Sequence, residues 1–207
     1  MREWGIRLSV DQSDKLDIFL DELELWNKKI NLTGLSSRQK IVDELLADSI
    51  LPTPFFPDQG TLLDVGSGAG FPAIPIKICK PGLECRLIEP SSKKTHFLKQ
   101  VIRLVRLEKI EVIQGRMEEE GGVIFPKTVD VITSRAFLPL PGFLTLCSPY
   151  LSPGGCIVAF LGGQSESAIQ ESTGIIDSRR LSLFKRIAYA LPGKGVKREI
   201  LILKKET

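Results

Sequence analysis

The sequence has very few residues of the kinds that bind metals. It contains one histidine, His96, and four cysteines, none of which forms a C-x-x-C pair. Protein zinc sites are built from clusters of these two residue types, so we expect no metal centre. The cysteines are expected to be free thiols in a reducing compartment. We expect His96 on a helix surface rather than at a catalytic position.

Long apolar runs and targeting signals are also missing. No run reaches the roughly 18 residues that a membrane-spanning helix needs. The N-terminal segment, MREWGIRLSVDQSDKLD, lacks the apolar core of a secretory signal. The chain is 207 residues long, 43% hydrophobic and 26% charged, which is typical of a folded globular protein. We therefore expect a cytoplasmic protein without membrane association. The net charge of +3 does not by itself indicate a nucleic-acid partner.

The beginning of the chain is expected to form a helical segment. Apolar residues at spacings of three and four predict an amphipathic helix over 9–30, with a capping box at its start. Ser36 with Gln39 predicts the start of a second helix, and prolines then interrupt the chain. We therefore divide the chain into an N-terminal helical segment, 1–58, and a main domain, 59–207.

From residue 61 onward, strands alternate with helices. The expected strands are 61–66, 86–89, 110–115, 129–135 and 154–160, and the expected helices are 72–79, 92–107 and 140–150. This alternation predicts a doubly wound, mostly parallel sheet. Two further strands, 183–191 and 197–205, have a connection too short for a parallel crossover, so they predict an antiparallel hairpin. The expected fold class is α/β, Rossmann-like, with this hairpin at its C-terminus.

A glycine-rich turn follows the first expected strand. The segment DVGSGAGFP, 64–72, places Gly66, Gly68 and Gly70 between a strand and a helix, where glycines permit a tight turn and a close approach of a ligand. Glu89 ends the next strand, 19 residues after Gly70, and a carboxylate there can accept both hydroxyls of a ribose. The glycine spacing is one residue shorter than that of dinucleotide enzymes. We expect a nucleoside with a short attached chain; the alternative is an ordinary turn beside a solvated acid.

Side chains after the third and fourth strands are expected at the same edge of the sheet. Arg116, Met117 and Glu118 follow one strand and Arg135 ends the next, and the carboxyl ends of parallel strands line the ligand crevice. Met117 and Glu118 would contact a purine ring, and Arg135 would hold a phosphate or a base edge. The alternatives are a plain surface loop for the first group and a salt bridge from Arg135 to Glu118 or Asp64.

Basic residues concentrate shortly after Glu89. They are Lys93, Lys94, Lys99, Arg103, Arg106 and Lys109, with one acid, Glu108, among them. A basic helix beside the crevice suits the phosphate backbone of a nucleic acid, and Lys93 and Lys94 lie nearest to the expected ligand site. Arg198, at the start of the last strand, is expected to reach the same rim. The alternative is a solvated helix face.

Motifs for covalent catalysis are absent. The sequence has no nucleophile elbow with a Ser-His-Asp set, no Walker loop and no Pro-Cys dipeptide for attack on a pyrimidine ring. If the chain transfers methyl groups, its acceptor needs neither covalent activation nor strong deprotonation. The ring nitrogen N7 of guanine meets that condition because it has a lone pair and no proton. Catalysis there rests on orientation and electrostatics.

The motifs, taken in order, resemble one known family. They are WNKKINLT at 26–33, ADS at 47–49, DVGSGAGFPAIP at 64–75, Lys93-Lys94, GRME at 115–118 and SRAF at 134–137. This combination resembles the RsmG (GidB) family of bacterial rRNA guanine-N7 methyltransferases, from residue 9 to the end of the chain. The resemblance implies S-adenosylmethionine as the methyl donor, no metal, and N7 of guanosine 527 in 16S rRNA of the small ribosomal subunit as the acceptor. We expect the protein to act as a monomer.

Spacing and resemblance together assign roles to individual residues. The expected cofactor-binding residues are Asp64, Gly66, Gly68, Gly70, Phe71, Glu89, Met117, Glu118 and Arg135. The expected RNA-binding residues are Lys93, Lys94, Arg116 and Arg198, and the expected catalytic residues are Arg116, Arg135 and Asn31.

Three positions depart from the family pattern. Leu45 replaces a histidine, Gly162 replaces a lysine, and Glu89 stands where an aspartate is common. The first two differences leave open a second hypothesis, a cofactor-binding RNA-interaction protein with weak or lost turnover. A third hypothesis, a nicotinamide-dependent oxidoreductase, requires a third glycine one residue later and a Tyr-Lys or His site. The sequence contains neither.

Overall fold

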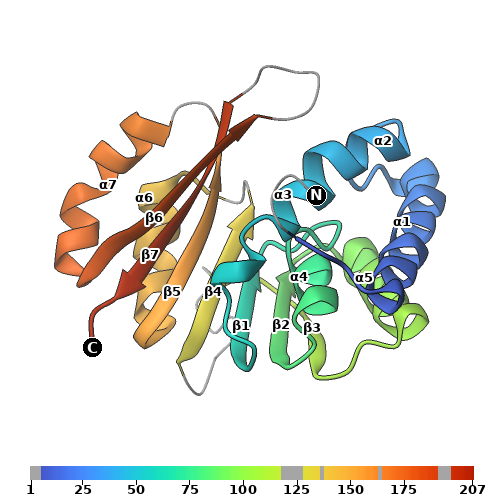
Figure 1. Ribbon diagram of the computed structural model, residues 1–207, viewed down its shortest axis with the longest axis horizontal. Helices are drawn as coiled ribbons and strands as arrows, with labels where there is room; N and C mark the ends of the chain where they lie inside the picture. The colour runs from blue at the N-terminus through green and yellow to red at the C-terminus, as the bar shows by residue number, and fades with distance from the viewer. Residues whose placement is uncertain (1–5, 118–127, 136–137, 163–164, 191–196) are drawn as a thin grey trace.

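A single seven-stranded sheet organises the part of the chain that the structure describes. The computed structural model describes residues 6–117, 128–135, 138–162, 165–190 and 197–207. The strands are β1 (Gly60–Val65), β2 (Leu83–Glu89), β3 (Ile110–Gln114), β4 (Val129–Arg135), β5 (Leu151–Leu161), β6 (Leu181–Ala190) and β7 (Lys197–Lys205). Their order is β3-β2-β1-β4-β5-β7-β6 (Figure 1). The first five strands of the chain are parallel, and β7 is antiparallel to both β5 and β6. The predicted Rossmann-like sheet with a C-terminal hairpin is therefore confirmed.

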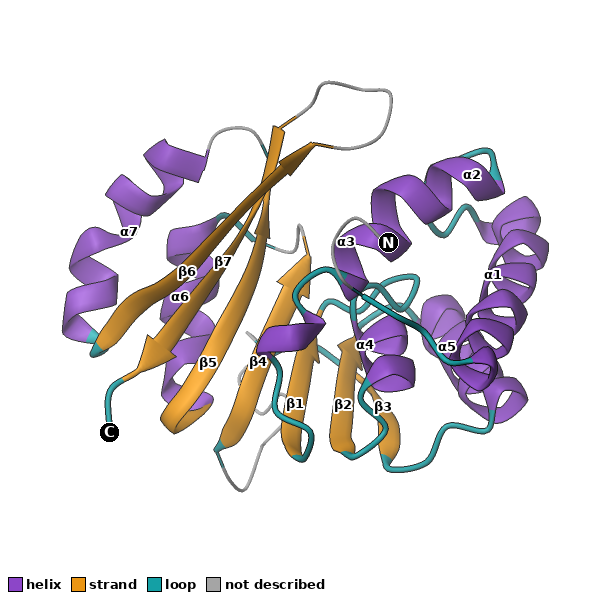
Figure 2. Ribbon diagram, in the orientation of Figure 1, coloured by secondary structure: helices purple, strands orange, loops and turns teal. Residues whose placement is uncertain are grey.

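Helices cover both faces of this sheet (Figure 2). On one face lie α1 (Val10–Ile30), α4 (Ala73–Cys79) and α5 (Ser92–Val105), and on the other lie α6 (Leu140–Cys147) and α7 (Ser165–Ser178). The shorter helical segments are α2 (Arg38–Ile41), the π-helical η2 (Val42–Leu46), α3 (Ala47–Ile50) and the 3-10 turns η3 (Thr53–Phe55) and η4 (Ser148–Tyr150). Because both faces are covered, the central strands are apolar along most of their length.

The N-terminal helices share a hydrophobic core with the sheet. Phe19 of α1 is fully buried. Its ring centroid lies 5.0 Å from that of Phe71, in the glycine-rich turn, and 6.5 Å from that of Phe97 on α5. Trp26 packs on Phe97 at 5.7 Å between ring centroids. Helix α1 is thus fastened to the segments that build the ligand edge of the sheet, and the division at residue 58 stays a prediction.

The second helix contains a π-helical turn where the sequence predicts a regular helix. Its N-cap is Ser37, whose backbone is extended and whose hydroxyl accepts a hydrogen bond from the Lys40 amide at 3.4 Å. The expected cap at Ser36 is therefore wrong by one residue. Further along, the Ala47 amide donates to the carbonyl of Val42, five residues back. Such a turn holds one more residue than an α-helical turn.

Two other expectations for the second half of the chain need correction. The helix expected over 140–150 ends at Cys147, because Pro149 has no amide hydrogen to continue it, and β5 then begins at Leu151. Helix α7 was not expected at all. Within α7 Ser172 is the one fully buried residue, and Ala168, Ile169, Ile175 and Ile176 are partly buried against the core at helical spacing. The polar Ser172 in the middle of this stripe weakens the apolar pattern in the sequence.

Side chains with metal or redox chemistry have structural roles in the described residues. No group of three metal-ligating side chains there can hold an ion, and no helix there is long and apolar enough to cross a bilayer. None of the four cysteines, all of which lie in the described residues, forms a disulfide. Burial raises the pKa of Cys79 to about 11 and that of Cys85 to about 12. These two thiols are therefore protonated at neutral pH and pack as apolar groups.

Candidate functional site

The glycine-rich turn connects the carboxyl end of β1 to α4. The amides of Gly66 and Ser67 both donate to the carbonyl of Ile88 at 3.0 Å, which ties the turn to the end of β2. Gly70 has a φ of 86°, and a Cβ there would lie 2.8 Å from Ile74 Cγ1. A larger residue at this position would therefore be strained and would also clash with α4. The sequence requires glycine here so that turn and helix can pack closely.

Glu89 and the glycine turn lie together, as the sequence predicts. The carboxylate is buried, with 4% of the residue exposed. Its Oε2 accepts a hydrogen bond from the Gly68 amide at 2.8 Å, and its Oε1 accepts one from the Ser91 amide, also at 2.8 Å. Each oxygen of an ionised carboxylate has two acceptor positions, so Glu89 can hold the turn and still accept hydrogen bonds from a ligand.

Asp64 lies in the last part of β1, one residue before the strand ends, and is almost completely buried. Its Oδ1 accepts a hydrogen bond from the Thr133 hydroxyl at 2.7 Å. Burial raises the pKa of Asp64 to about 6, with a smaller contribution in the same direction from the charge of Glu89. Next to it, the Ser134 hydroxyl donates to the Val65 carbonyl at 3.0 Å. Side-chain bonds from β4 therefore fix the end of β1.

Two apolar side chains among the expected cofactor-binding residues are also buried at this edge. Phe71 packs on Phe19, and Met117 is 8% exposed and belongs to the same hydrophobic cluster as Val65 and Ile88, near the ends of β1 and β2. Both are close to the turn, and their contact with a cofactor stays a prediction. Glu118 lies outside the described residues, as do Ala136 and Phe137 of the SRAF motif.

Arg135 and Arg198 meet a buried acid that the sequence analysis did not single out as a site residue. Arg135, at the end of β4, lies 3.3 Å from Asp48 Oδ2 through its Nη2, and Arg198 of β7 lies 2.5 Å from the same oxygen through its Nη1. Both guanidinium groups also donate to the backbone carbonyl of Glu44 at 2.8 Å. Among the described residues, the acid that Arg135 contacts is Asp48 and not Asp64, one of the two partners expected as the alternative. The other, Glu118, lies outside the described residues.

The environment of Asp48 explains the electrostatics of this group. Burial raises the pKa of Asp48, and the charges of Arg135 and Arg198 oppose that shift. The Tyr189 hydroxyl forms a hydrogen bond with the same carboxylate, and burial together with the Asp48 charge raises the pKa of Tyr189. The one sequence signal for Asp48 is its place in the ADS motif.

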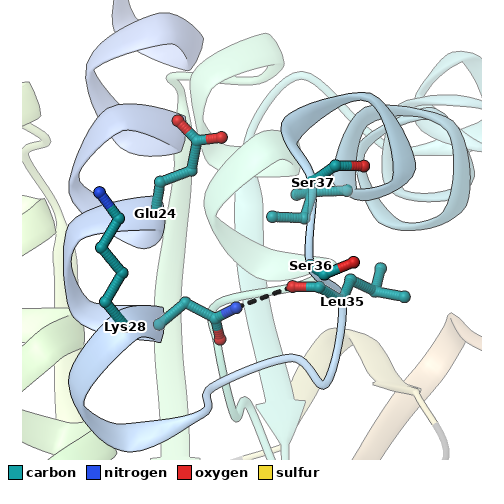
Figure 3. Close-up of a pocket in the computed structure, with 7 residues that line it drawn as sticks. Glu24, Lys28, Leu35, Ser36 and Ser37 are labelled. Carbon is teal, nitrogen blue, oxygen red and sulfur yellow. Dashed lines mark hydrogen bonds between the residues drawn. The ribbon is translucent and has the colours of Figure 1, made fainter.

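The WNKKINLT motif forms the end of α1 and the loop after it. Asn31 is the C-cap, with a φ of 45°, and its Oδ1 accepts a hydrogen bond from the Gly34 amide at 3.0 Å. Asn27 donates to the Leu35 carbonyl at 2.8 Å, the dashed line in Figure 3. The pocket drawn there is lined by Glu24, Asn27, Lys28, Leu35, Ser36, Ser37 and Ile41. In this structure both asparagines order the loop, and a catalytic role for Asn31 stays a prediction.

The expected basic residues lie on segments that leave the same edge of the sheet. Lys93 is exposed and Lys94 half-buried, and both belong to the first turn of α5, which follows Glu89. Arg116 is exposed just after β3. His96 is exposed on α5, as expected. The carboxyl ends of β1, β2 and β3 therefore bring the glycine turn, an acid and several cations into one region.

Known proteins match nearly the whole chain. A family model described as rRNA small subunit methyltransferase G matches residues 12–187. The ribosomal RNA small subunit methyltransferase G of Acetivibrio thermocellus is 33% identical over 204 residues, which are 98% of this chain and 84% of that protein. The protein of the same name from Geobacter sp. (strain M21) is 33% identical over 201 residues, covering 97% of this chain and 92% of that protein.

Solved structures share the fold at much lower identity. M. jannaschii TYW2, solved in complex with AdoMet, superposes with a TM-score of 0.65 at 16% identity, over 84% of this chain and 78% of that one. An O-methyltransferase from Bacillus cereus, solved in complex with SAH, gives 0.64 at 17% identity over 90% of each chain. These likenesses show the class I methyltransferase fold alone. The family model and the near full-length relatives go further, and this chain belongs to the rRNA small subunit methyltransferase G family.

Proposed function

We propose that this protein transfers a methyl group from S-adenosylmethionine to N7 of guanosine 527 in 16S rRNA of the small ribosomal subunit. Family membership supports methyl transfer to small-subunit rRNA. The observation that carries the cofactor assignment is the pairing of Glu89 with the Gly68 amide at the carboxyl edge of the sheet. The nucleotide position and the N7 specificity rest on the motif resemblance.

The turn fits a methyl-donating nucleoside. Among the described atoms, a Cβ at Gly68 would meet only the Gly66 carbonyl oxygen, at 3.7 Å, so the space beside the turn is open. Glu89 would accept the ribose hydroxyls through its remaining acceptor positions. The remaining assigned cofactor contacts are Asp64, Gly66, Gly70, Phe71, Met117, Glu118 and Arg135. When bound, S-adenosylmethionine supplies an electrophilic methyl group on a sulfonium.

Cationic residues at this edge would bind and orient the RNA. Lys93 and Lys94 stand at the start of α5 and suit phosphate groups, since the phosphate backbone dominates the affinity of RNA-binding surfaces. We assign Arg116 to RNA binding and, with Arg135 and Asn31, to catalysis. Arg198 is also assigned to RNA binding, and in this structure its guanidinium donates to Asp48 and to the Glu44 carbonyl.

For this reaction the protein has mainly to position the base and the methyl donor. Guanine N7 has a lone pair and no proton, so the protein needs no general base to activate it. Holding the base so that N7 faces the methyl group, in a region shielded from water, supplies the rate enhancement through orientation and fixed charges. We also propose that the protein works in the cytoplasm and as a monomer; a size measurement on the purified protein checks the oligomeric state.

The direct test uses small subunits that lack the modification. The protein is incubated with them and with S-adenosylmethionine, and mass spectrometry of 16S rRNA fragments maps any added methyl group. A single N7-methylguanosine at position 527 supports the proposal. A methyl group elsewhere overturns the specificity, and no methyl group overturns the activity.

The second hypothesis, an RNA-binding relative with lost turnover, makes a different prediction. It rests on Leu45, which lies half-buried in η2, and on Gly162, just after β5. That protein would bind S-adenosylhomocysteine and small subunits yet yield no methylated product. The oxidoreductase hypothesis is not kept, because the family and the structural neighbours are methyltransferases.

A further inference from the structure

Five residues from three parts of the chain form a buried polar cluster at the edge of the sheet. We call it the Asp48 cluster, and its members are Glu44, Asp48, Arg135, Tyr189 and Arg198. The side chains of Arg135 and Arg198 are only 18% and 19% exposed, and that of Asp48 only 2%. The cluster joins the second helix to strands β4, β6 and β7.

The π-helical turn places one backbone oxygen where two strands can reach it. The Glu44 carbonyl accepts hydrogen bonds from Arg135 and Arg198, each at 2.8 Å. The Glu44 side chain adds a third contact, with its Oε2 3.5 Å from Arg198 Nη2. Single π turns of this kind are frequent at functional sites. Here the turn fixes two arginines that come from strands far apart in the sequence.

The cluster adjoins the proposed methyl-donor site. Arg135 directly follows Ser134, whose hydroxyl donates to the carbonyl of Val65, the residue before Gly66. Helix α3, which carries Asp48, packs against α4, the helix that leaves the glycine turn. A shift of Asp48 would therefore displace residues at the end of β4 and beside the glycine turn.

The charges of the cluster balance. Glu44 and Asp48 provide two carboxylates, and Arg135 and Arg198 provide two guanidinium groups. While they are paired with these carboxylates, the two arginines offer little net positive charge to an RNA phosphate, although their positions are well defined. A buried acid that pairs with two arginines lowers the affinity of those arginines for phosphate and fixes their positions.

We propose that Asp48 is a positioning residue for methyl transfer, which holds Arg135 and Arg198 in place at the expense of affinity for RNA. This inference rests on the proposed function. It predicts that removing the Asp48 charge has opposite effects on binding and on turnover. RNA binds more tightly, because two arginines are released towards phosphate, and methyl transfer becomes slower, because their positions are no longer fixed.

The test is steady-state methylation of unmodified small subunits by the full chain and by Asp48→Asn. We expect kcat to fall about tenfold or more and KM for the subunit to fall about threefold. The logarithm of subunit affinity should also depend more steeply on the logarithm of salt concentration, by about one phosphate contact. The affinity for S-adenosylhomocysteine should fall by a smaller factor than kcat, because the Glu89 contacts are intact and Arg135 is the one assigned cofactor contact that the variant releases.

Two further variants keep the proposal open to refutation. Glu44→Gln removes a partly exposed carboxylate of the cluster, so KM should fall with a smaller loss of kcat, and this variant decides the matter if Asp48→Asn does not fold. Asp43→Asn is the matched control: its carboxylate lies one residue away in η2 and accepts from Gln39 at 2.9 Å. It should behave like the wild type. A raised KM, an unchanged kcat in Asp48→Asn, or equal effects in Asp43→Asn and Glu44→Gln would overturn the proposal.

These results are distinguishable from a failure of the proposed function. If the wild type adds no methyl group to any small subunit, the proposed function fails before the variants are compared. If the wild type is active and Asp48→Asn shows no split between KM and kcat, the proposed function stands and the positioning role of Asp48 falls.

Discussion

The buried carboxyl of Asp64 makes the stability of this protein depend on pH in a defined direction. Burial raises its pKa from 3.8 to about 6 in the folded protein, whereas the unfolded chain exposes the group to water. Between these two pH values the folded protein keeps a proton that the unfolded chain has released. Stability from this group is therefore fully present at low pH and is lost as the pH rises towards 6. A shift of about 2 pKa units corresponds to roughly 3 kcal/mol.

The substitution Asp64→Asn isolates this effect. The amide keeps the oxygen that accepts from Thr133 at 2.7 Å but does not titrate in this range. The free energy of unfolding of both proteins is measured by urea denaturation at several values between about pH 4 and pH 8. The variant should gain on the wild type by about 2–3 kcal/mol across that range. Any fixed cost of burying the amide cancels, because it is the same at every pH.

The comparison has a clear negative outcome. If the stability curves of wild type and Asp64→Asn run parallel, the carboxyl titrates alike in the folded and unfolded chains, and the argument from burial is refuted. Asp14→Asn, on the exposed surface of α1, controls for the loss of a negative charge as such. Its curve should follow the wild type.

Three further predictions address the turn, the core and the surface. Glu89→Gln removes the charge of the carboxylate that accepts hydrogen bonds from two backbone amides. The affinity for S-adenosylhomocysteine, measured by calorimetry, should therefore fall about tenfold or more. The control Glu84→Gln, exposed on the same strand, should leave this affinity unchanged. Phe19→Ala removes a buried ring between α1 and the sheet and should lower the free energy of unfolding by about 3–5 kcal/mol; a loss below about 1 kcal/mol would contradict the shared core. Arg38→Ala breaks three ion pairs with α1, and the arginine side chain is 33% exposed. The free energy of unfolding should therefore fall by about 1 kcal/mol or less, and by less still in high salt. A larger loss that does not depend on salt would argue against a surface network.

Local patterns were enough to predict the sheet and its ligand edge. Parallel strands buried on both faces appear in the sequence as continuous apolar runs, and the glycines between 64 and 72 predict the turn. The position of Glu89 follows from the strand alternation, because β1 and β2 are parallel neighbours whose ends lie side by side. Each of these features depends on residues close together in the sequence or on a regular repeat.

Contacts between distant residues were not predictable in the same way. Arg198 and Asp48 are 150 positions apart, and no periodicity indicates which arginine a buried acid will meet. The family resemblance assigned Arg198 to RNA binding, yet in the folded chain its guanidinium contacts the carboxylate of Asp48. Helix α7 was missed for a different reason: the polar Ser172 interrupts its short apolar stripe, which consists of Ala168, Ile169, Ile175 and Ile176.

The extra residue in η2 also bears on how the length of this region can vary. A single π turn accommodates one additional residue while the helix on either side keeps its phase. Deleting one residue within Val42–Leu46 should therefore straighten the helix and leave Asp48 facing the strands, whereas the same deletion in a regular helix would rotate everything downstream by about 100°. A relative that is one residue shorter in this turn would keep an acid at the place of Asp48, and it would lose only the backbone carbonyl that Glu44 offers to the two arginines.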